Sequence, residues 1–234
     1  MPMSDKGKRA AMAAIVAAGA SLGLAGTAAA ATVPATLAVN QACYVTVGKA
    51  RPMMVVTGTG YIPGDQVLVS DATGTFDQTV VADPNGAITA TAPAPAAYFS
   101  KPGEKADVIT ATDSSENGNE YVGTARTELS FLGASANKTK RAHGLRALTF
   151  KTKWTFSGFP VGKSIYAHYI YGKKTVARQS FGKAKGPCGL LTAHARLYPA
   201  TPHHREYHLQ IDSRRAYSRH ASPRLVTKVG LELF

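Results

Sequence analysis

The sequence predicts an all-β protein built from two tandem β-sandwich domains behind an N-terminal signal peptide. Three observations support this fold class. A glycine-rich turn motif occurs twice, 98 residues apart. Between the turns lie short runs rich in Val, Ile, Thr and Tyr, which are typical of β-strands. No sustained helical periodicity follows Ala31.

The N-terminus has the layout of a secretory signal. Lys6, Lys8 and Arg9 precede an uncharged run, rich in Ala, Gly and Leu, that extends from Ala10 to Ala31 and ends in small residues suited to cleavage. An uncleaved membrane anchor is the alternative, but Ala and Gly insert poorly into a bilayer. We therefore expect residues 1–31 to be removed, and the mature protein to be secreted or bound to the cell wall without a transmembrane segment.

The internal repeat divides the mature chain. Gly60-Tyr61-Ile62-Pro63-Gly64 aligns without a gap on Gly158-Phe159-Pro160-Val161-Gly162. A unit of about 95 residues that occurs twice indicates a domain duplication. We predict domains over residues 40–133 and 142–234, joined by a linker over residues 134–141. About seven short strands in each unit favour an immunoglobulin-like Greek-key sandwich.

Charge is divided unevenly between the predicted domains. Residues 31–137 hold 5 Lys and Arg against 10 Asp and Glu, a net charge of −5, whereas residues 138–234 hold 19 against 3, a net charge of +16. The positive electrostatic field therefore belongs to the second domain. Two opposite charges could also dock the domains on each other or pair chains head to tail.

Several motifs resemble a known group of proteins. The string from Gly60 to Val67, followed by Ala82-Asp83-Pro84-Asn85-Gly86, resembles bacterial immunoglobulin-like domains. The second half, with residues 156–159 and 184–189, is similar to secreted tandem-domain proteins of high-GC Gram-positive (actinobacterial-type) bacteria. The resemblance implies a fold and an extracellular or cell-surface location. It carries no catalytic residues, so we expect a non-catalytic binding or structural protein without a cofactor.

The basic surface of the second domain is the main functional hypothesis. We expect it to bind anionic polymers of the cell envelope, because Lys and Arg bind phosphate and carboxylate groups. Another surface protein is the alternative partner, and no nucleic acid is expected outside the cell. The predicted contact residues are Lys173, Lys174, Lys183, Lys185, Arg214, Arg215, Arg219 and Arg224.

A metal-dependent protein or enzyme is the rival hypothesis. His204, Glu206 and His208 would share one face of a strand, because side chains alternate. Two imidazoles and a carboxylate are ligands that zinc accepts. The alternative is a polar outer face of an edge strand.

Aromatic residues concentrate in the strand predicted around residues 165–171. Alternation places Ile165, Ala167, Tyr169 and Tyr171 on one face, and Tyr166, His168 and Ile170 on the other. One face is expected in the core. We expect the other to be ordinary surface; the alternative is that it stacks on a sugar or a base.

The two cysteines, Cys43 and Cys188, fall one in each predicted domain. Neither domain can therefore hold an internal bridge. An interdomain disulfide, two free thiols and an intermolecular bridge all remain open.

Overall fold

The structure is a computed structural model that describes residues 35–97, 99–114, 120–137, 151–198 and 206–230. These residues form fifteen β-strands and no helix, which confirms the all-β prediction. No described segment is therefore a helix capable of crossing a membrane. All described residues belong to one compact unit. The predicted signal peptide, residues 1–31, lies outside them.

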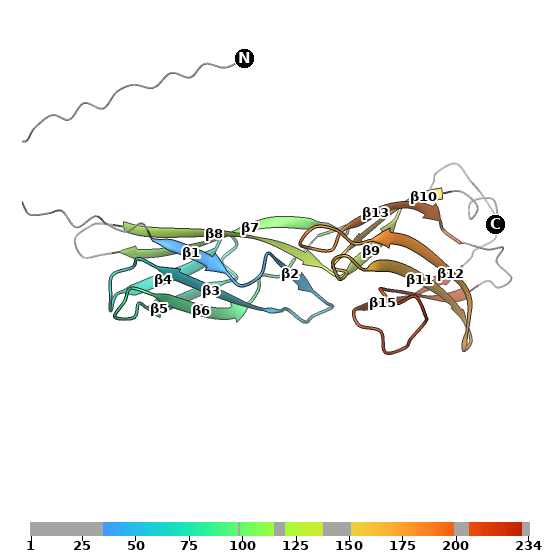
Figure 1. The fold of residues 1–234 in the computed structure, drawn as a ribbon, viewed down its shortest axis with the longest axis horizontal. Helices are drawn as coiled ribbons and strands as arrows, with labels where there is room; N and C mark the ends of the chain where they lie inside the picture. Colours follow the sequence, from blue (N-terminus) through green and yellow to red (C-terminus); the bar gives the residue numbers. More distant parts are fainter. Residues whose placement is uncertain (1–34, 98, 115–119, 138–150, 199–205, 231–234) are drawn as a thin grey trace, which may run out of the picture. The chain divides into compact units, whose positions relative to one another are not determined.

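The first half of the chain forms two sheets (blue to green in Figure 1). One has the strand order β1-β3-β6 and the other β2-β8-β7-β4-β5. All neighbours are antiparallel except β2 and β8, which are parallel. The strands are β1 (Thr36–Val39), β2 (Cys43–Thr46), β3 (Met53–Thr59), β4 (Gln66–Asp71), β5 (Asp77–Val81), β6 (Ile88–Pro93), β7 (Glu104–Ser114) and β8 (Glu120–Phe131).

The core of this half lies between its two sheets. Burial alternates along β3 and β4, because successive side chains of a strand point to opposite faces. Met54 and Val56 of one sheet and Val67, Val69 and Ile109 of the other are fully buried in one cluster. Both strands are continuous apolar runs in the sequence, at Met53–Val56 and Val67–Val69, so it is the packing of the two sheets that selects which face of each is buried.

The second half also forms two sheets, with the strand orders β13-β10-β9 and β12-β11-β14-β15. The predicted linker, residues 134–141, is wrong at its start, because Ala134–Ala136 belong to β9 and pair with β10. Small residues suggest a linker, but they also fit a strand packed on large aromatic side chains. The strands are β9 (Gly133–Ala136), β10 (Lys151–Ser157), β11 (Ser164–Tyr171), β12 (Lys174–Lys183), β13 (Leu191–Arg196), β14 (Glu206–Asp212) and β15 (Arg224–Gly230).

The second half has a separate, aromatic core. Trp154, Phe156 and Tyr169 are buried there with aliphatic residues of β11 and β14. Leu132 and Val45, from the first half, also pack against this cluster. The second core therefore includes side chains of the first half, and the predicted domain limits of 40–133 and 142–234 stay a prediction.

The internal repeat is reproduced by matching backbone hydrogen bonds. The Gly64 amide donates to the Ala82 carbonyl, and the Ala82 amide donates to Asp65, both at 2.9 Å. In the second half, the Gly162 amide donates to Ala184 and the Ala184 amide to Lys163, also at 2.9 Å. Gly64 and Gly162 both adopt positive φ, of 86° and 77°, which favours glycine. The repeated sequence motif thus encodes a repeated loop geometry.

Two features join the halves locally. A disulfide links Cys43 of β2 to Cys188, with a Cα–Cα distance of 5.3 Å, so of the three alternatives the structure contains the bridge within the chain. Gly158 follows β10 at a φ of 77°, and a Cβ added there would lie 2.7 Å from Val45 and 2.8 Å from the Leu132 backbone. Only glycine therefore allows this close approach.

Candidate functional site

The candidate site is residues 213–224, the connection between β14 and β15 together with the first residue of β15, which we call the arginine loop. It contains Arg214, Arg215, Arg219 and Arg224, all of them exposed. The loop begins directly after Asp212 at the end of β14, and the Ala221 amide donates to the Ser218 carbonyl at 3.0 Å within it. Its position is set by buried polar groups of the strands beside it.

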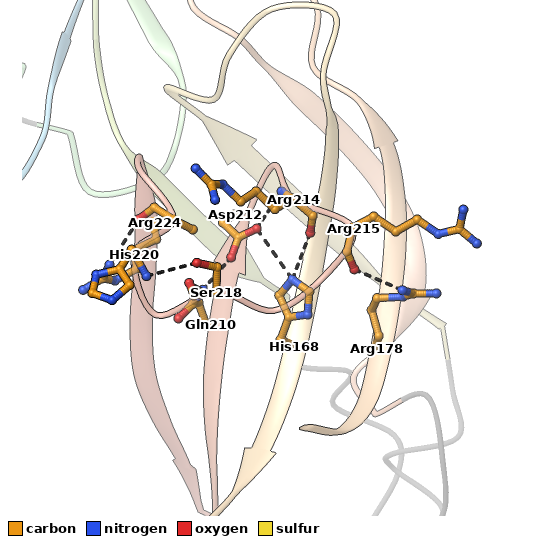
Figure 2. A network of polar contacts seen from close by, with 10 residues as sticks. His168, Arg178, Gln210, Asp212, Arg214, Arg215, Ser218, His220 and Arg224 are labelled. Carbon is orange, nitrogen blue, oxygen red and sulfur yellow. Dashed lines mark hydrogen bonds and ion pairs between the residues drawn. The ribbon is translucent and has the colours of Figure 1, made fainter. Parts of the chain in front are cut away.

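A buried histidine and aspartate anchor the start of the loop (Figure 2). The His168 Nε2 lies 3.0 Å from the Arg214 carbonyl oxygen and 3.6 Å from Asp212 Oδ1. The Arg214 amide donates to Asp212 Oδ1 at 2.7 Å. The side chains of His168 and Asp212 are 1% and 0% exposed. Since a carbonyl only accepts hydrogen bonds, Nε2 carries the proton in this arrangement.

Gln210 extends the anchor to the middle of the loop. Its Nε2 donates to Asp212 Oδ2 at 2.6 Å and to the Ser218 carbonyl at 2.9 Å. Both oxygens of Asp212 therefore accept a hydrogen bond from a different part of the network. The paired groups favour one loop conformation, because an unpaired buried polar group is costly. The Nδ1 of His168 is the one atom of this anchor without a hydrogen-bond partner among the described residues.

Two arginines donate hydrogen bonds to backbone carbonyls of the loop. Arg178 of β12 donates from Nη1 to the Arg215 carbonyl at 3.0 Å. Arg224 donates from Nη1 to the carbonyls of Arg219 and Ala221. Figure 2 shows the side chains of Arg214 and Arg215 extending away from His168 in opposite directions. The loop backbone is thus held in place while these two guanidinium groups remain exposed.

The electrostatics of the loop are one-sided. Asp212 is the only acidic residue whose side chain the structure describes in residues 151–230, and it is fully buried. No ion pair to an exposed arginine of the loop occurs among the described residues. The guanidinium groups therefore create a positive field that extends over roughly the Debye length, about 8–10 Å at physiological salt.

Tyr217 covers the anchor from the solvent side. Its ring centre lies 5.9 Å from that of His168, in an edge-on arrangement, and the residue is 40% exposed. An exposed aromatic ring among arginines offers a stacking surface for a sugar or another planar group.

The predicted contact residues fall into two groups. Asp212 pairs with Tyr166, and Lys183 pairs with Ser164, so Lys183 lies at the same end of the sheet as the arginine loop. Lys185 follows shortly after it and is exposed. Lys173 and Lys174 lie at the β11–β12 turn, five residues further along β11, which corresponds to about 17 Å. The predicted set is therefore not a single patch.

Sequence reasoning missed Arg178, Gln210, Tyr217 and the role of His168. The turn at Gly172 and Lys173 indicates that β11 pairs with β12, but it does not fix the register. A register shift between Tyr169 and Ile170 places Arg178 opposite His168. Such a shift has no clear signal in the sequence.

The aromatic face predicted on β11 differs from the structure. His168 and Ile170 are buried, as are Ile165, Ala167 and Tyr169, whereas Tyr171 is 48% exposed. Both faces of the strand are covered, one by the core and the other partly by the arginine loop. The second face is therefore largely buried, which leaves little of it available for the alternative of stacking on a sugar or a base.

A cluster of tyrosines lies on the core side of β11. The Tyr169 hydroxyl donates to the Leu197 carbonyl at 2.7 Å, and its ring contacts that of Tyr198. Burial raises the pKa of Tyr198 to about 12, with a smaller contribution from Tyr207. Burial also raises the pKa of Tyr169. The Tyr198 hydroxyl has no hydrogen-bond partner among the described residues.

The predicted zinc ligands are only partly described. His204 and the side chain of Glu206 lie outside the described residues, and His208 is exposed on β14. Among the residues that the structure describes, no group of three or more His, Cys, Asp or Glu side chains could hold a metal ion.

Comparisons with known proteins identify no family for this chain. No protein-family model matches the chain, and no curated protein matches it. A solved structure of a "tetra-tandem repeat in extending region of large adhesion protein" is similar over 85% of this chain, with 10% identity and a TM-score of 0.29. The chain spans about half of that protein, 49% of its length. A similarity of this size carries no argument about function.

Proposed function

We propose that this chain is an exported, non-catalytic binding protein whose arginine loop contacts anionic polymers of the cell envelope. One observation carries the proposal. Arg214 and Arg215 expose their guanidinium groups while buried His168 and Asp212 fix the backbone of the loop. Binding then costs less conformational entropy than it would from a flexible basic tail.

The fold supports a binding role of this kind. We propose that each half is an immunoglobulin-like Greek-key sandwich. In the first half β3 pairs with β6, while β4 and β8 flank β7; in the second half β10 pairs with β13, while β11 and β15 flank β14. Loops at the ends of such sandwiches are common binding sites, because rigid strands position them.

The charge distribution supports an anionic partner. The first half would act as a spacer or as a second contact surface, since its net charge of −5 does not favour a polyanion. Phosphate and carboxylate polymers share the chemistry that guanidinium groups recognise, which is paired hydrogen bonds to two oxygens of one anion.

The test is equilibrium binding of the mature chain to long-chain polyphosphate and to polyglutamate over a series of salt concentrations. We expect the logarithm of the binding constant to fall linearly with the logarithm of salt concentration. The double variant Arg214→Gln/Arg215→Gln should reduce the steepness of that dependence by about 1 to 2 units.

A matched control is Lys151→Gln/Lys153→Gln. These exposed lysines lie on β10 of the same half, so the control removes the same charge outside the loop. Equal loss of binding in both variants would show that only net charge matters and would contradict the proposal. Absence of binding to both polymers at low salt would also contradict it.

A further inference from the structure

The first half contains a pocket that the proposed function does not use. It has a volume of about 620 Å³ and is lined by residues that follow β2, precede β3 and surround the end of β8. Lys49 and Arg51 contribute the two charged side chains of its lining, and Phe99 and Phe131 contribute two aromatic rings.

The two cations are placed by a tight turn. Val47 and Ala50 exchange two backbone hydrogen bonds of 3.0 Å, which closes a two-residue turn over Gly48 and Lys49. Gly48 has a φ of 61°, a conformation that favours glycine. Arg51 follows this turn directly, so the backbone that carries both cations is ordered before any ligand arrives.

The charge of the pocket opposes the charge of the half that contains it. Residues 31–137 have a net charge of −5 and hold only five Lys and Arg, of which Lys49 and Arg51 line this pocket. No acidic residue lines it among the residues that the structure describes. Solubility alone does not explain why two of the five basic residues lie at one pocket of an acidic half. Binding of an anionic ligand would explain it.

The remaining lining is largely apolar. The rings of Phe99 and Phe131 lie 5.9 Å apart at 41°, and Leu132 is buried beside them. The backbone amide of Leu132 already donates to the Thr46 carbonyl at 2.8 Å. This wall therefore offers an apolar surface, suited to a ring or a short hydrocarbon group.

We infer that this pocket binds a small organic anion, in which a carboxylate or phosphate group is joined to an apolar ring. The anionic group would contact Lys49 and Arg51, and the ring would pack against Phe99 and Phe131. This site is separate from the arginine loop and does not depend on the proposed function.

The test is a titration of the mature, ¹⁵N-labelled chain with phenyl phosphate, benzoate, inorganic phosphate and benzyl alcohol, followed by amide chemical shifts. We expect both aromatic anions to shift the amides of residues 48–51 and those of Ala96, Ala97 and Phe99. Inorganic phosphate lacks the aromatic ring and benzyl alcohol lacks the anionic group, so each should bind at least about tenfold more weakly.

Two double variants make the test specific. Lys49→Gln/Arg51→Gln should weaken binding of phenyl phosphate by at least about tenfold, since it removes both charged hydrogen-bond donors. Lys101→Gln/Lys105→Gln removes the same charge from exposed residues of the same half that do not line the pocket. It should leave binding unchanged.

Three results would overturn the inference. They are an equal loss in both double variants, equal affinity for inorganic phosphate and phenyl phosphate, and no shifts at residues 48–51 with either aromatic anion at about 10 mM. Thermal unfolding of each variant checks that it is folded.

Discussion

Replacing Asp212 by Asn tests how the arginine loop is held. Asp212 accepts the Arg214 amide at Oδ1 and the Gln210 side chain at Oδ2. Asn offers one acceptor oxygen and an amide group, so one of these buried donors loses its partner. An unsatisfied buried donor costs about 1–3 kcal/mol, and the lost contact with His168 adds to this. We therefore expect the free energy of unfolding to fall by about 2–4 kcal/mol.

The same variant separates loop order from net charge. It adds one positive charge to the chain, so a mechanism based on charge alone predicts tighter binding to polyphosphate. We expect weaker binding, by about fivefold or more, because ordering even one loop residue costs about 1–2 kcal/mol. The assays are urea unfolding and polyphosphate binding at fixed salt, on protein shown to be folded.

Asp113→Asn is the matched control in the first half. Asp113 is also fully buried, but it accepts the Ile62 amide at Oδ2 while its Oδ1 has no partner among the described residues. Asn can keep that bond, so we expect a loss of stability below about 1.5 kcal/mol and unchanged binding. If Asp212→Asn leaves stability within about 0.5 kcal/mol of the parent, or tightens binding, the anchoring role is wrong.

Further predictions concern stability. Reducing the Cys43–Cys188 bridge, which spans 145 residues, should lower the free energy of unfolding by about 4–5 kcal/mol, measured in urea with and without reductant; an unchanged midpoint would contradict this. Tyr198 keeps its proton in the folded state until about pH 12, whereas the unfolded chain releases it near pH 10. Tyr198 therefore contributes fully to the free energy of unfolding below pH 10, and about 2 kcal/mol of that free energy is lost as the pH rises towards 12. Tyr198→Phe should reduce this alkaline loss in urea titrations at pH 7 to 12, and an unchanged pH profile would count against it. Gly158→Ala should destabilise by at least about 2 kcal/mol, more than Gly162→Ala, because both have a φ of 77° but only Gly158 is crowded; equal midpoints would refute the crowding.

The sequence contained the local features of the fold. The apolar runs at 53–57 and 67–70 predict strands, and the structure forms both, burying every second residue: Met54, Val56, Val67 and Val69. The repeated glycine motif predicts equivalent loops, and the hydrogen bonds around Gly64 and Gly162 agree. These features depend on neighbours in the chain, so they can be identified without the fold.

The site could be predicted only in outline. The basic surface follows from composition, since residues 138–234 hold 19 Lys and Arg against only 3 Asp and Glu. The anchor cannot be predicted in this way, because His168, Gln210 and Asp212 come together only when β11 pairs with β14. Such contacts depend on strand register, which is set by tertiary packing and turn geometry.

The most direct test of the proposed binding site is to map it by amide chemical shifts during a polyphosphate titration of the mature chain. We expect the largest changes in residues 213–224 and near Arg178, with smaller changes at Lys173 and Lys174. Changes concentrated at the β11–β12 turn, or in the first half of the chain, would contradict it.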